Sequence, residues 1–94
     1  MKTYSIFTEL LNELLRYSRK NDTAMSNFSD LVAVQNLEDR ITRCYNSNYY
    51  SHNEYRILID LCYEIKTSMR EIIRINQQIK SFRKQLRKNN RKLA

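Results

Sequence analysis

Apolar residues recur at steps of three and four along most of this chain, and polar runs divide the pattern into three segments. In the first, residues 3–19, Phe7, Leu10 and Leu14 share one face of a helix while Glu9 points the other way. The polar run at residues 20–23 interrupts the pattern. The spacing therefore predicts a first helix that ends near residue 19.

The second segment repeats the same spacing at Leu31, Val34, Leu37 and Ile41. Either Ser26 or Asn27 can cap this helix, because both side chains accept hydrogen bonds from free amides in a first turn. Its end falls in the run of short polar residues at 46–48, where asparagine tolerates the left-handed backbone conformation that stops a helix.

The third segment begins with a capping box, in which Ser51 and Glu54 satisfy each other's backbone amides. From there a heptad pattern runs to the end of the chain without a slip. Its positions are Tyr55, Leu58, Cys62, Ile65, Met69, Ile72, Asn76, Ile79, Arg83, Leu86, Asn90 and Leu93. A helix over residues 52–92 would be about 60 Å long, roughly twice the length of either earlier helix.

The two halves of this long helix differ in composition. Extra apolar residues widen the stripe in the first half, which suits packing against both preceding helices. In the second half the seam turns polar at Asn76, Arg83 and Asn90, and buried asparagines in such seams fix register and partner number. We therefore expect an all-α three-helix bundle over residues 1–73, continued by a basic helical extension over residues 74–94.

The heptad seam of the extension needs a partner helix, and we expect a second copy to supply it. The residues expected at this dimer or partner interface are Met69, Ile72, Asn76, Ile79 and Leu86. The pattern does not decide between a parallel and an antiparallel pair, and a different protein could occupy the same seam.

Composition supports the all-helical prediction, because none of the 94 residues is glycine or proline. A chain of average composition would contain roughly a dozen of the two together. The tight turns of a multi-stranded fold depend on residues that tolerate positive φ, above all glycine. A chain without glycine or proline is therefore expected to be helical.

Charge is distributed unevenly along the chain. Every acidic residue lies at or before Glu71, whereas residues 72–94 contain eight of the 17 lysines and arginines. The preceding part holds nine bases against ten acids. A nearly neutral body thus continues into a strongly basic segment, and such blocks are typical of proteins that bind polyanions.

The charge pattern suggests a non-enzymatic protein that binds nucleic acid, DNA or RNA, through phosphate contacts. The residues expected to make these contacts are Lys80, Arg83, Lys84, Arg87, Lys88, Arg91 and Lys92. The alternative is a helical adaptor or inhibitor that docks its long helix on another protein and places the basic segment on an acidic surface. A third option is attachment to a membrane surface through Ile75, Ile79, Phe82 and Leu86.

Other chemistry finds little support in the sequence. No stretch reaches the ~20 apolar residues of a membrane span, and no signal-peptide core follows the first turn, so we expect an intracellular protein. Cys44 and Cys62 fall on apolar helix faces, where reduced and buried thiols are usual. With one histidine, His52, and no metal-ligand spacing, we expect no metal site and no cofactor.

Overall fold

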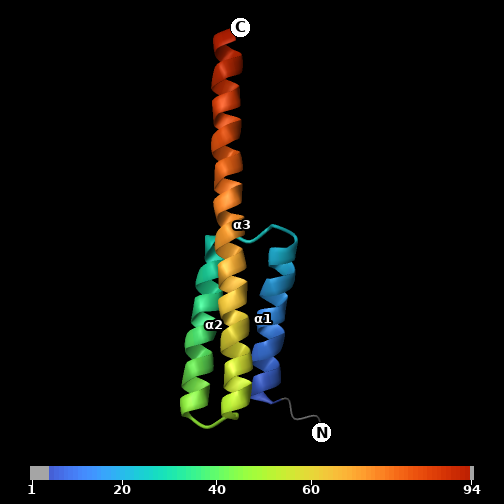
Figure 1. Cartoon of the computed structure of the whole chain (residues 1–94), viewed down its shortest axis with the longest axis vertical. Coiled ribbons are helices and arrows are strands. Elements are labelled where there is room, and N and C mark those ends of the chain that lie inside the picture. The colour runs from blue at the N-terminus through green and yellow to red at the C-terminus, as the bar shows by residue number, and fades with distance from the viewer. Residues whose placement is uncertain (1–4, 94) are drawn as a thin grey trace.

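The computed structural model describes the chain from Ser5 to Leu93, with side chains described up to Asn90. It contains three helices, α1 (Ile6–Asp22), α2 (Phe28–Asn46) and α3 (His52–Leu93), and no strand occurs in this described part. The all-α helical bundle is confirmed. α1 and α2 flank the first half of α3, which then continues alone far beyond them (Figure 1).

Side-chain caps fix the helix starts. The Ser5 hydroxyl accepts a hydrogen bond from the Thr8 amide at 3.1 Å. At the start of α2 the cap is Asn27, in a full capping box with Asp30. The capping box predicted for the third helix is also present, since the Glu54 amide donates to the Ser51 hydroxyl and the Ser51 amide donates to the Glu54 carboxylate, both at 3.2 Å.

The end of α1 differs from the sequence prediction, because the helix continues through the polar run to Asp22. The side chain of Asn21 is buried, and its amide nitrogen donates to the Ser68 hydroxyl of α3 at 2.7 Å. Packing on α3 therefore holds one further turn in helical form despite its polar composition. Tertiary contact outweighs local preference here.

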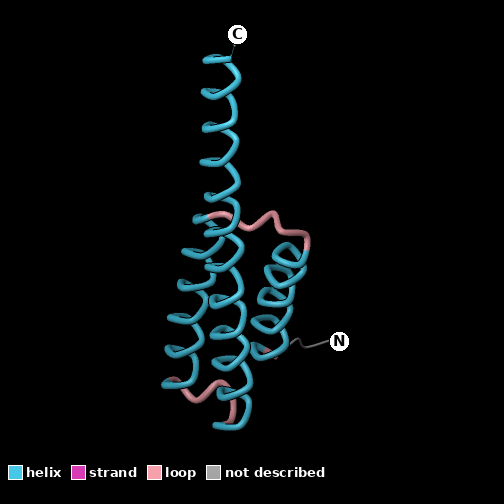
Figure 2. Tube along the Cα trace, turned by 45° about the horizontal axis from the view of Figure 1, so that its top comes forward, coloured by secondary structure: helices cyan, strands magenta, loops and turns pink. Residues whose placement is uncertain are grey.

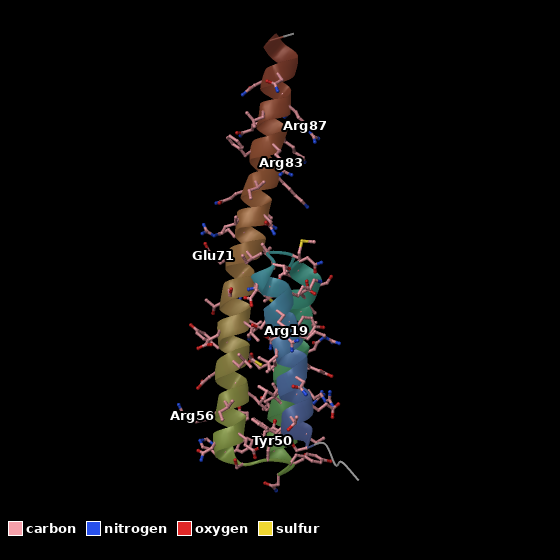
Figure 3. All side chains as sticks on the ribbon, turned by 90° about the vertical axis from the view of Figure 1, so that its right-hand side faces the viewer. Arg19, Tyr50, Arg56, Glu71, Arg83 and Arg87 are labelled. Carbon is pink, nitrogen blue, oxygen red and sulfur yellow. The ribbon has the colours of Figure 1, made fainter. Side chains whose placement is uncertain are left out.

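The turn between α2 and α3 contains the left-handed asparagine that the sequence predicted. α2 ends at Asn46, and Asn48 adopts the left-handed conformation with φ of 63°. Just beyond it Tyr50 is buried, and its hydroxyl donates to the Ile41 carbonyl of α2. Burial raises the pKa of Tyr50 to about 12. This tyrosine ties the turn to the bundle, and Figure 3 shows it at the end of the body opposite the extension.

One hydrophobic core joins the three helices. Its members, all of them buried, are Leu10 and Leu14 of α1, Val34, Leu37 and Ile41 of α2, Tyr50 of the turn, and Leu58, Cys62, Ile65 and Met69 of α3. Burial of one such aliphatic side chain contributes about 1.5–3 kcal/mol. The residues that α3 contributes follow the predicted heptad positions, so the first half of that pattern packs within the chain.

Both cysteines are free thiols, as expected. Cys62 is fully buried, and burial raises the pKa of its thiol to about 12. A thiol that stays protonated and out of reach of solvent is a packing residue, not a nucleophile.

A polar contact crosses between α2 and α3 at the edge of this core. The Lys66 side chain is largely buried, and its ammonium group donates to the Gln35 side-chain oxygen at 2.9 Å. The same group forms an ion pair with Glu38. A buried ammonium needs partners of this kind to offset the loss of water.

The body ends where α3 passes the loop between α1 and α2. The Asn76 side chain donates to the Ala24 carbonyl of this loop at 3.2 Å, and every described residue from Gln77 to Asn90 is exposed. We use the name extension for the part of α3 that begins at Gln77; the boundary expected from the sequence lies after residue 73. Figure 2 shows the two connecting loops at opposite ends of the body, with the α1–α2 loop beside the point where α3 leaves it.

The free half of α3 makes the molecule elongated. Its principal extents are 67 × 26 × 16 Å, and the radius of gyration is 18.6 Å. A compact chain of this length would have a radius of gyration near ~12 Å.

Candidate nucleic-acid interface

The basic residues of the extension are presented on a straight, uncovered helix. Five of the seven predicted phosphate-binding residues lie in the part with described side chains, and all five are exposed: Lys80, Arg83, Lys84, Arg87 and Lys88. In Figure 3 the labelled Arg83 and Arg87 project from α3 well above the last turn of the body. Arg91 and Lys92 belong to α3, but their side chains lie outside the described residues.

Helix geometry gathers most of these bases on one side. At 100° per residue, Lys80, Lys84 and Arg87 fall within about 60° of one another. Lys88 lies at one margin of this group and Arg83 at the other. We call this surface, formed by these five residues, the basic face.

No acidic group neutralises the basic face. The last acidic residue in the chain, Glu71, lies before the extension and pairs with Arg74 at 2.5 Å. Within the described part of the chain, none of the five bases of the face forms an ion pair. Neighbours four residues apart, such as Lys80 and Lys84, are like charges on adjacent turns and repel each other.

The other side of the extension, together with the turn of α3 just before it, carries an apolar row. Ile75, Ile79, Phe82 and Leu86 follow steps of four, three and four, and they are 39, 44, 61 and 46% exposed. Their directions are centred about 140° away from those of Lys80, Lys84 and Arg87. The extension is therefore an amphipathic helix, and its apolar row has no partner within the described chain.

The five residues expected at a partner interface occupy different environments. Ile79 and Leu86 are exposed on the apolar row, whereas Met69 is fully buried in the body. Ile72 is partly buried, and Asn76 bonds to the α1–α2 loop. The heptad pattern therefore contributes to two surfaces, the core of the body and then the apolar row.

Helix geometry explains this division. A straight α-helix has 3.6 residues per turn, so positions seven apart drift by about 20° per heptad. Between Leu58 and Leu86 the accumulated drift is about 80°. Ile75 and Phe82, which are not positions of the predicted seam, consequently join Ile79 and Leu86 on one face.

A notch of about 540 Å³ lies where the extension leaves the body. One wall is the α1–α2 loop with the start of α2, which contributes Met25 and Phe28; the other wall is α3, which contributes Ile73, Lys80 and Arg83. Met25 and Phe28 are 67 and 69% exposed. Neither residue stands out in the sequence, since only the loop geometry brings the two beside the basic face.

The loop wall is fixed by an unusual backbone conformation. Ala24 has φ of 58°, a left-handed value that is uncommon for a residue with a Cβ. Its amide donates to the Asn21 carbonyl at 2.9 Å, and its carbonyl accepts the Asn76 side chain. Contacts at both ends hold the residue in this conformation beside α3.

Charges at the start of α2 are already balanced. The Lys20 ammonium lies 2.9 Å from the Asp30 carboxylate. Burial alone would raise the pKa of Asp30, but hydrogen bonds from the Asn27 backbone and from Lys20 outweigh it, and the pKa lies below its ordinary value. Because Asp30 is already paired with Lys20, it does not balance the charges of Lys80 and Arg83, which line the notch.

Among the described residues, no group of three or more histidine, cysteine, aspartate or glutamate side chains is arranged to hold a metal ion. None of the described helices is long and apolar enough to cross a membrane.

Comparisons of this chain with models of protein families, with curated proteins and with solved structures found no match.

Proposed function

We propose that this protein binds nucleic acid through phosphate contacts made by the basic face of α3. The observation that supports the proposal is the exposed row of bases on a helix that projects from the body and lacks acidic neighbours. Binding is non-enzymatic and depends weakly on sequence, because contacts to phosphates carry no base information.

The arrangement of the bases favours a polyanion over a purely solubilising role. Three pairs four residues apart, Lys80/Lys84, Arg83/Arg87 and Lys84/Lys88, place like charges side by side and weaken an isolated helix. Phosphates along a nucleic-acid backbone would relieve this repulsion at every turn. A charged end that served solubility alone would not need such spacing.

The test is a fluorescence-anisotropy titration of the nuclease-treated protein with labelled duplex and single-stranded DNA and RNA at several salt concentrations. Five phosphate contacts should give a slope of log K against log salt near about −4.5 on duplex and about −3.5 on a single strand. Absence of binding to all four probes at about 50 mM salt would overturn the proposal.

A second candidate function is supported by the apolar row. We propose that a helix of a second copy covers Ile75, Ile79, Phe82 and Leu86. Gln78 and Gln85 flank this row on one side, so paired extensions would bring amides rather than bases together along that edge. Among the described side chains, Arg83 is the only base beside the other edge.

Sedimentation equilibrium tests the dimer. The double substitution Phe82→Gln and Leu86→Gln should raise the dimer dissociation constant by at least about 100-fold, since two apolar side chains leave the contact. The pair Gln77→Ala and Ser81→Ala, off the row, should leave it within about twofold. A wild-type chain that stays monomeric at all accessible concentrations would refute the dimer and favour the adaptor function, with a different protein on this row.

A further inference from the structure

We propose that the notch between the α1–α2 loop and α3 seats an unpaired base of a single-stranded nucleic acid against Phe28, while Lys80 and Arg83 hold the adjoining phosphates. This inference rests on the proposed function and deepens it, because it names the form of nucleic acid that the protein prefers.

The first support is the pairing of groups across the notch. Phe28 and Met25 form an exposed apolar wall, and Lys80 and Arg83 line the same cavity from α3. An aromatic side chain beside two uncompensated cations suits a ligand in which a flat aromatic group is followed by an anionic group. A nucleotide within a strand has this combination.

The second support is the size and polarity of the cavity. Its volume of about 540 Å³ falls within the roughly 300–1,000 Å³ typical of small-molecule sites. Asn27, Asn76 and Gln77 also line it, so amide groups border the apolar wall. Amides can donate to and accept from the edge of a base.

A single strand fits these groups better than a duplex. In a duplex the bases are stacked on each other and paired, so a protein side chain cannot lie flat against one. In a single strand every base has a free face, and stacking on an aromatic ring does not depend on base identity. The notch therefore predicts that the protein prefers single strands to duplexes and has no strong preference for base sequence.

The experiment compares a labelled 20-nucleotide single strand with a duplex of equal length at fixed salt, using the full chain and three variants. Phe28→Ala should weaken single-strand binding by about tenfold and leave duplex binding within about twofold, because only the stacking contact is lost. Phe28→Tyr should retain single-strand affinity, since a tyrosine ring also stacks. Tyr63→Ala is the matched control, because Tyr63 is 68% exposed on the body and lies outside the notch.

Circular dichroism would establish that each variant is folded, as expected for a substitution of a side chain that is 69% exposed. Equal wild-type affinity for the two probes, or equal losses on both in Phe28→Ala, would overturn the inference while the proposed function stands. Failure of the wild-type chain to bind either probe would overturn the proposed function itself.

Discussion

Replacing Lys80, Lys84, Arg87 and Lys88 together with glutamine is expected to weaken nucleic-acid binding by about 1,000-fold. Each lost phosphate contact is taken as about 1 kcal/mol, and a factor of ten in affinity corresponds to about 1.4 kcal/mol. The salt slope should become shallower by about 3.6 on duplex, because four counterion-releasing contacts disappear. Anisotropy titrations at several salt concentrations measure both quantities.

The matched control removes the same amount of charge from the body. Arg16, Arg19, Arg43 and Arg56 are exposed on the bundle, and none has an ion pair within the described residues. Their replacement with glutamine should lower affinity by less than about tenfold, an effect of net charge alone. Equal losses in the two quadruple variants would show that binding follows total charge and not the basic face.

The Leu58→Ala substitution is expected to lower the free energy of unfolding by about 2–5 kcal/mol. Leu58 is fully buried in the core of the body, and truncation leaves a cavity that the surrounding helices cannot fill completely. A domain of this size has a stability of roughly 5–14 kcal/mol, so the loss is a large part of the total. Urea unfolding followed by circular dichroism is the measurement.

Ile57→Ala is the neighbouring control. Ile57 is 53% exposed on the same turn of α3 and has the same number of side-chain carbons as Leu58. Its truncation should cost less than about 1 kcal/mol. Similar losses for the two variants would contradict the orientation of α3 in the bundle.

The elements that follow from local chemistry were predictable from the sequence. The Ser51–Glu54 capping box, the asparagine stop before it and the three-four spacing of the core positions each depend on residues near one another in the chain. The three helices and the basic segment could be placed for this reason. Exposure of the basic residues also followed, because no acidic residue after Glu71 is present to pair with them.

Features that depend on distant contacts could not be predicted in the same way. Asn21 looks like a helix breaker in the sequence, yet its bond to Ser68 of α3 keeps the last turn of α1 helical. The position of Phe28 beside Lys80 and Arg83 depends on a left-handed alanine, Ala24, which nothing in the sequence indicates. All four residues of the apolar row could be found from the sequence, where they suggested a membrane surface. The heptad pattern contains only Ile79 and Leu86 of them, because positions seven apart drift by about 20° per repeat on a straight helix.

The length of the free part of α3 also sets how many base pairs one bound chain would cover. From Gln77 to Leu93 the extension contains 17 residues and is therefore about 26 Å long. At about 3.4 Å per step, a helix laid along a duplex would cover about seven or eight base pairs. Chains that follow one another end to end along one line of a long duplex would therefore occupy about seven or eight base pairs each.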